Sequence, residues 1–331
     1  MIQETLEDTR KIVWPVIKNY LKDPTYPKQF LIPKKFKKDA DKFWDINKVY
    51  PLRLGKYLRP TLVLLIAKAL GVYSKLAINT AAAMQLSEEW ILISDDIEDN
   101  SDSRRGKPTL HKIYGTELAI NASDSLETIM WKMIIDCKND EIIDEFYRIM
   151  MRTTLGQGVE QIWTNSKKKI KEDDYFFVAD SKSAYYSIAG PMRLGAILAG
   201  ASKQKLDKIT EFGLHLGRCF QLIDDILDLE QDKKEGKSTL AIEKGIEYTK
   251  KLAEKEDYMV NLKNEKKDLI KNRKLLDTIV EQSPNMIFVN QNGRLIYVNK
   301  KCEEIMGYSK KEFYSPKFDF LKLIAPADRG F

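Results

Sequence analysis

Long apolar runs are missing from this chain of 331 residues. The longest, Leu62 to Ala67, stops at Lys68, whereas a membrane-spanning helix needs about 20 apolar residues in a row. The N-terminus mixes charged and apolar residues and lacks the short apolar stretch and cleavage site of a secretory signal. These absences exclude a transmembrane segment, and we expect a cytoplasmic protein.

Cysteine and histidine are also scarce. The three cysteines, Cys137, Cys219 and Cys302, are far apart, and the two histidines have no partners at metal-ligand spacing. This excludes a disulfide framework and a zinc site of the CxxC type. The net charge of +6 is small for the length. We expect it to be spread out, without a basic tract mixed with aromatics, and therefore expect no nucleic-acid partner.

Helical periodicity dominates the first three quarters of the chain. From residue 1 to 256 apolar side chains recur at spacings of three and four, and few stretches alternate. We predict an all-α domain with helices at 4–22, 59–70, 75–97, 116–137, 141–163, 175–200, 204–228 and 241–256. Residues 24–51 are rich in Pro and Lys, and residues 104–108 contain Gly, Lys and Pro, which predicts that both segments are connections.

Two further segments follow the predicted all-α domain. Residues 257–275 are highly charged, and leucines recur at seven-residue spacing around them, which predicts a connecting helix, either solvated or part of a coiled coil. Residues 276–331 have an α+β pattern, in which 286–289 and 294–298 predict two strands of a hairpin. This last segment is too short to bury much core by itself.

An acidic pattern that occurs twice is the sharpest signal in the sequence. Each copy closes an apolar helix, and the copies consist of Asp95, Asp96 and Asp99, and of Asp224, Asp225 and Asp228. Carboxylates four residues apart lie on the same face of a helix. Mg²⁺ takes oxygen ligands and is usually held by one or two carboxylates together with substrate phosphates. The two copies therefore predict a magnesium and diphosphate site.

Basic residues accompany both acidic motifs. They are Lys56, Arg59, Arg104, Arg105, Lys182 and Lys237. Guanidinium groups bind phosphate oxygens in two-pronged contacts, whereas lysines act as point charges. Each residue alone is an ordinary surface charge. Together with the acidic motifs they predict clamps for two anionic substrates.

These motifs, in this order, resemble those of the polyprenyl synthetase family, the trans-isoprenyl diphosphate synthases. The resemblance covers residues 10–240, with GKYLRP at 55–60, DDIEDNSDSRRGKPTLHKIYG at 95–115, GQGVEQ at 156–161, KSAYYSIAGPMRLGA at 182–196, FQLIDDILDL at 220–229 and GKST at 236–239. It implies an isoprenoid synthase-type bundle of helices around a central cavity, a homodimer, and a Mg²⁺-dependent prenyltransferase.

The resemblance also implies roles for the matched residues. Three Mg²⁺ ions on the diphosphate of an allylic substrate would be held by Asp95, Asp99 and Asp224, supported by Asp96, Asp225 and Asp228. The same diphosphate would be contacted by Arg104, Lys182, Gln221 and Lys237. The diphosphate of isopentenyl diphosphate, the second substrate, would be bound by Lys56, Arg59 and Arg105. The floor for the growing chain would be formed by Trp90 and Ile91, which favours a short farnesyl or geranylgeranyl product. Plain core packing is the alternative for Trp90, because a large aromatic residue in an apolar helix is ordinarily core.

The chain also departs from the family pattern. Glu88 stands where the family has His or Gln, and Ser94 replaces the usual histidine before the first motif. An ionised glutamate repels a diphosphate unless it turns to Lys56 or Arg59. After GKST a stretch of the family's helices is absent, and residues 241–256 already resemble its terminal helix.

Residues 276–331 resemble the opening part of a PAS sensor domain. An alternative stays open because of this tail, Glu88 and the absent helices. In it, the chain is a catalytically weak partner or regulatory subunit that joins a full-length synthase in a heteromer. A class I terpene cyclase is another, because it uses the same two acidic motifs. The basic residues for a second diphosphate argue against the cyclase.

Overall fold

The computed structural model describes residues 2–235, 239–262, 286–291, 294–315 and 318. The chain divides into two compact units, one of Thr5–Val260 and one of Met1–Glu4 with Asn261–Phe331. Each unit is described by itself. Among the described helices, none is long and apolar enough to cross a membrane.

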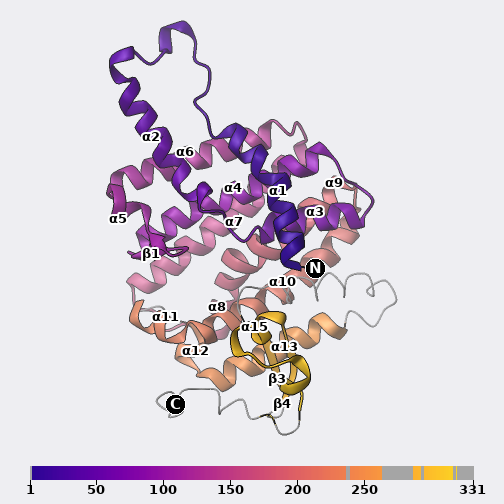
Figure 1. Cartoon of the computed structure of the whole chain (residues 1–331). Coiled ribbons are helices and arrows are strands. Elements are labelled where there is room, and N and C mark those ends of the chain that lie inside the picture. Colours follow the sequence, from indigo (N-terminus) through magenta and orange to yellow (C-terminus); the bar gives the residue numbers. More distant parts are fainter. Residues whose placement is uncertain (1, 236–238, 263–285, 292–293, 316–317, 319–331) are drawn as a thin grey trace. The chain divides into compact units, whose positions relative to one another are not determined.

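The larger unit is a helical bundle, which confirms the predicted all-α class (Figure 1). Its helices are α1 (Ile2–Tyr20), α2 (Lys37–Leu52), α3 (Leu58–Ala69), α4 (Lys75–Glu98), α5 (Leu110–Tyr114), α6 (Thr116–Ile135), α7 (Asp140–Asn165), α8 (Glu172–Val178), η3 (Ala179–Ala189), α9 (Gly190–Leu198), α10 (Lys203–Leu227), α11 (Leu229–Glu235), α12 (Leu240–Glu243) and α13 (Ile246–Leu262).

Two of the predicted boundaries are wrong. Residues 24–51, predicted to be a connection, contain α2, which buries only one narrow face that includes Ile46 and Tyr50. Such a short apolar stripe is easily missed among lysines and acids. The helix predicted at 241–256 is interrupted at Gly245, whose φ of 87° lies in the left-handed region. It therefore forms α12 and α13.

The expectation that basic charge is spread out is wrong for residues 22–38. This segment holds six lysines and three aromatic residues. It includes two short 3₁₀ turns, η1 (Lys28–Phe30) and η2 (Lys34–Phe36), and no residue of either turn is buried. In Figure 1 the segment extends away from the helices that pack together.

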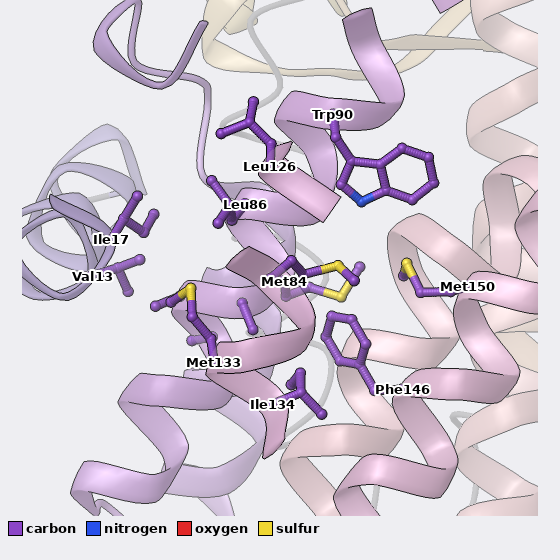
Figure 2. Packing of buried hydrophobic residues seen from close by; sticks show 14 of the residues in the cluster. Val13, Ile17, Met84, Leu86, Trp90, Leu126, Met133, Ile134, Phe146 and Met150 are labelled. Atoms are coloured by element: carbon purple, nitrogen blue, oxygen red, sulfur yellow. The ribbon is translucent and has the colours of Figure 1, made fainter. Parts of the chain in front are cut away.

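Helix α4 runs through the core of the bundle. Its N-terminus is capped by Ser74, whose side chain accepts a hydrogen bond from the Ala77 backbone N–H at 3.2 Å. Buried residues occur on all its faces, as expected of a helix surrounded by others. Figure 2 shows Met84 and Trp90 of α4 near Phe146 and Met150 of α7. This packing fixes the end of α4, where the first acidic motif lies.

The stretch η3 is a π-helix, a form that is frequent at functional sites. Glycines of neighbouring helices let it approach closely, and these are Gly156, Gly213 and Gly217. A Cβ on Gly217 would lie 2.4 Å from the Cβ of Ala184, so only glycine fits there. Because Ala184 belongs to η3 and Gly217 to α10, this contact fixes η3 next to the helix of the second acidic motif.

The smaller unit contains the predicted hairpin, formed by β3 (Phe288–Gln291) and β4 (Arg294–Val298) in antiparallel pairing. Two short helices follow, α15 (Lys300–Met306) and α16 (Lys310–Phe313). Val298, Cys302 and Phe313 form a small core. The connecting helix predicted at 257–275 lies outside the described residues beyond residue 262.

Candidate active site

The first acidic motif lies at the C-terminal end of α4. Asp99 caps the helix, and its backbone N–H donates to the Asp95 carbonyl oxygen at 2.8 Å, so these two residues are one turn apart. Burial raises the pKa of Asp95, and the charges of Asp99 and Glu98 raise it further, while Lys182 lowers it. A cation would relieve this accumulation of negative charge.

Asp96, the middle residue of this motif, points to partners inside the protein. The hydroxyl of Tyr50 in α2 donates to Asp96 Oδ2, and the Arg104 guanidinium donates to Oδ1 at 2.9 and 2.5 Å. The Asp96 side chain is only 1% exposed. It therefore holds α2 and the strand of Arg104 to the end of α4.

The second acidic motif has the same construction at the end of α10. Asp228 caps the helix, and its N–H donates to the Asp224 carbonyl oxygen at 2.8 Å. The middle residue, Asp225, is buried and accepts a hydrogen bond from Gln221 Nε2 at 2.7 Å. Burial raises the pKa of Asp225 to about 7. Gln221, predicted to contact substrate, is thus engaged with Asp225 in this structure.

Lys182 of η3 lies near the first acidic motif. Its Nζ donates to Glu160 Oε2 on α7 at 2.9 Å. Burial disfavours the ammonium charge, but the carboxylates of Asp95 and Glu160 outweigh burial and raise the pKa of Lys182. Lys182 is therefore a permanent cation beside Asp95.

The predicted basic clamp contains an internal counter-ion. Arg59 Nη1 lies 3.1 Å from Glu88 Oε2, and its Nη2 donates to the Ser187 hydroxyl at 2.8 Å. The Arg59 guanidinium also lies 4.3 Å from the centroid of the Tyr186 ring. The structure thus shows Glu88 turned to Arg59, which is one of the two partners suggested by the sequence.

Arg105 belongs to the same cluster because of a tight hairpin. Strands β1 (Ser103–Arg104) and β2 (Lys107–Pro108) are joined by Arg105 and Gly106. Both of these residues have positive φ, which is typical of the tight turns that connect two-residue hairpins. The Arg105 guanidinium lies 2.9 Å from Glu89 Oε2 and 3.7 Å from Glu88 Oε1. Burial raises the pKa of Glu89 to about 7, although Arg105 opposes this.

Lys56 connects the basic cluster with the second acidic motif. Its side chain is exposed, and it lies within electrostatic reach of Asp224 and Glu88. Among the described residues, no three His, Cys, Asp or Glu side chains are close enough to hold a metal by themselves. The residues predicted to hold the metal, Asp95, Asp99 and Asp224, offer carboxylate oxygens, which suit Mg²⁺ when phosphates complete its ligands.

The remaining predicted residues occupy different surroundings. Trp90 is 8% exposed and belongs to the main core (Figure 2). Ile91 is partly buried and packs against this core. The indole Nε1 of Trp90 has no hydrogen-bond partner among the described residues. Lys237 lies outside the described residues.

The contributors to the site that were not predicted from sequence include Tyr50, Glu89 and Glu160. Glu160 lies within the GQGVEQ motif, which was a usable signal. Tyr50 and Glu89 carry no local signal, because their partners Asp96 and Arg105 are distant in sequence.

Comparisons with known proteins bear on this arrangement. Residues 45–275 match the model of the polyprenyl synthetase family, and residues 274–329 match a PAS domain model. The geranylgeranyl diphosphate synthase of Methanosarcina mazei is 32% identical over 213 residues, which cover 58% of this chain and 65% of the relative. The farnesyl diphosphate synthase of Geobacillus stearothermophilus is 33% identical over 198 residues, covering 55% and 65%. The chain thus spans just under two thirds of the length of these curated relatives.

Solved structures give the same picture of the fold. A geranyltranstransferase from Thermotoga maritima superposes with a TM-score of 0.67 at 25% identity, covering 84% of this chain and 99% of that chain. A geranylgeranyl pyrophosphate synthetase from Pyrococcus horikoshii superposes with a TM-score of 0.68 at 21% identity, covering 78% and 90%.

Proposed function

Because the chain belongs to the polyprenyl synthetase family, we propose that it condenses an allylic prenyl diphosphate with isopentenyl diphosphate. The product would be short, of the farnesyl or geranylgeranyl class, as in the names of the curated relatives. The observation that carries the proposal is the shared construction of the two acidic motifs. In each, the middle aspartate is held by internal hydrogen bonds, whereas the outer aspartates lie at the helix end.

The first subsite would take the allylic diphosphate. Asp95, Asp99 and Asp224 would hold Mg²⁺, which supplies positive charge to the departing diphosphate when bound. Lys182 is a cation beside Asp95 and would bind the same diphosphate. Arg104 would act on this subsite from its position on Asp96, and the role of Lys237 stays a prediction.

The second subsite would take isopentenyl diphosphate on Lys56, Arg59 and Arg105. In the reaction the allylic C–O bond breaks and diphosphate leaves, the allylic carbon bonds to the double bond of isopentenyl diphosphate, and the released diphosphate accepts the proton that the resulting cation loses. The apolar core around Trp90 would keep water away from the cationic carbon. Trp90 and Ile91 would also limit the length of the product.

We extend the proposal to the organisation of the chain. Residues 1–256 would form the synthase, 257–275 a helical linker and 276–331 a PAS-like module. The synthase would act as a homodimer, or as a heteromer with a full-length synthase.

The purified full chain tests this proposal. It is incubated with Mg²⁺, labelled isopentenyl diphosphate, and dimethylallyl, geranyl or farnesyl diphosphate, with a chelator as control. The proposal predicts Mg²⁺-dependent C15 or C20 alcohols after dephosphorylation. No elongation by a chain that is folded and helical would contradict a self-sufficient synthase. Consumption of the allylic substrate without isopentenyl diphosphate would indicate a cyclase instead.

One observation favours a second candidate function, a partner or regulatory subunit. Glu88 is paired with Arg59 in the proposed second subsite, so a diphosphate would have to displace this carboxylate from the guanidinium group. A partner subunit would show activity only when mixed with a full-length synthase, and it would co-purify with that synthase.

A further inference from the structure

Residues 22–38, here called the basic loop, concentrate positive charge on one projecting segment (Figure 1). The loop carries a single acidic residue, Asp23, and one of its lysines, Lys37, pairs with Asp41 in α2 at 3.0 Å. Its lysines are all exposed, and they are Lys22, Lys28, Lys34, Lys35, Lys37 and Lys38. This density of one charge sign contrasts with the rest of a chain whose net charge is only +6. The complementary surface is therefore anionic.

The basic loop also exposes apolar side chains between its lysines. Phe30 is 75% exposed, Leu31 57% and Phe36 50%. Contiguous exposed apolar surface bordered by polar residues marks interaction sites, and Phe30 and Leu31 are neighbours in the chain between lysines. Since no residue of η1 or η2 is buried, these side chains are not part of the core.

Two prolines fix the shape of the basic loop. Pro27 precedes η1 and Pro33 precedes η2, and both have the φ near −55° that proline imposes. Phe30 and Leu31 are therefore presented together at the end of η1. A loop with preset backbone loses less entropy when it binds a surface.

We propose that the basic loop binds membranes that contain anionic lipids, with Phe30 and Leu31 inserted between headgroups. Clustered lysines attract anionic headgroups, while neighbouring aromatic and aliphatic side chains enter the boundary between headgroups and acyl chains. Nucleic acid is a poorer fit. The loop contains no arginine, and its central apolar run, Phe30-Leu-Ile32, is partly aliphatic, whereas bases stack on aromatic rings or guanidinium planes.

The proposal predicts how the full chain partitions onto vesicles. It should sediment with vesicles of phosphatidylcholine and phosphatidylglycerol but not with phosphatidylcholine alone, and added salt should weaken the binding. Phe30→Ser with Leu31→Ser should weaken binding at least tenfold, as should Lys34→Glu with Lys35→Glu.

Matched control variants distinguish binding through the basic loop from non-specific binding of the protein to vesicles. Tyr73 is 58% exposed elsewhere, so Tyr73→Ser should bind vesicles like the wild type. Lys203→Glu with Lys205→Glu, at the exposed start of α10, should also keep most of the binding. Circular dichroism verifies that every variant is folded.

Several outcomes would overturn the proposal. One is an absence of binding to anionic vesicles, and another is equal binding by the loop variants and the controls. A third is that the wild type binds an RNA oligonucleotide but no vesicles, and that the loop variants lose the RNA binding. Prenyl transfer is measured separately on the same samples. Failure of that reaction leaves the vesicle result unaffected, because the basic loop does not depend on the proposed activity.

Discussion

Replacing Glu88 by glutamine should strengthen the binding of isopentenyl diphosphate. The Glu88 carboxylate lies beside both guanidinium groups that we propose bind the second diphosphate. Its Oε2 is 3.1 Å from Arg59 Nη1, and its Oε1 is 3.7 Å from Arg105 Nη2. An incoming diphosphate has to displace it. Glutamine keeps the shape of the side chain and its contact with Gln85 but removes the charge.

The size of the effect follows from this ion pair. The Arg59 and Glu88 side chains are 19% and 14% exposed, so solvent screens them only in part. Two unit charges about 4 Å apart interact by about 4 kcal/mol at an effective dielectric constant of about 20, which is an upper limit. A hydrogen bond to a charged group contributes about 1.5–3 kcal/mol net. We therefore expect a gain of about 1.4–2.8 kcal/mol, a ten- to hundredfold lower KM.

The assay is steady-state prenyl transfer with isopentenyl diphosphate varied at saturating allylic substrate. Glu88→Asp, which keeps the charge, and Glu141→Gln, which removes an exposed charge on α7, should leave KM within a few-fold of the wild type. In an Arg59→Gln background the gain from Glu88→Gln should shrink, because the released guanidinium is absent. An unchanged or higher KM in folded Glu88→Gln would refute the reasoning and identify Glu88 as a residue that positions Arg59 productively.

Three other substitutions test the packing and electrostatics of the site. Gly217→Ala should lower the free energy of unfolding, measured in urea, by about 1–3 kcal/mol, because the new Cβ would lie 2.4 Å from Ala184. The control Gly158→Ala, whose Cβ would have nothing within 4 Å, should be neutral or slightly stabilising. Equal effects of the two substitutions would contradict the close approach of the helices at Gly217. Trp90→Ala should cost about 3–5 kcal/mol in thermal or urea unfolding and lengthen the product, and an unchanged product length would remove its role as a floor. Burial raises the pKa of Glu89 to about 7 from an ordinary 4.5, so the folded state holds this proton more tightly and its contribution to stability falls as pH rises through that interval. Urea titrations of Glu89→Gln at several pH values should show a smaller fall than the wild type, and an identical slope would contradict the assignment.

Helices and strands that have a regular local pattern of apolar residues could be predicted from the sequence. The apolar run ending in Asp95 predicts both α4 and the carboxylates at its end, and the hairpin of β3 and β4 follows from its strand pattern. The narrow apolar stripe of α2 was missed because only a few of its residues are buried. The π-helical form of η3 was also missed, because close contacts with glycines such as Gly217 are tertiary.

Only the structure shows which aspartate of each acidic motif binds partners inside the protein. Asp95 and Asp96 are adjacent and chemically identical, yet Asp96 is taken up by Tyr50 and Arg104. Tyr50 lies 46 residues away in sequence, so no local pattern could indicate it. In the same way, sequence suggested Lys56 or Arg59 as the partner of Glu88, whereas the tertiary arrangement pairs it with Arg59 and also brings Arg105 within 3.7 Å.

The most direct test of the central claim is the turnover of Asp95→Asn and Asp224→Asn, measured with Mg²⁺ and both substrates. Asp124→Asn, which removes an exposed carboxylate on α6, is the matched control. If the outer aspartates of both motifs act on one diphosphate, each site variant should lose at least about a thousandfold in rate, and the control should not. Circular dichroism and thermal unfolding should show all three folded as the wild type is. Turnover near that of the wild type in either site variant would contradict the claim.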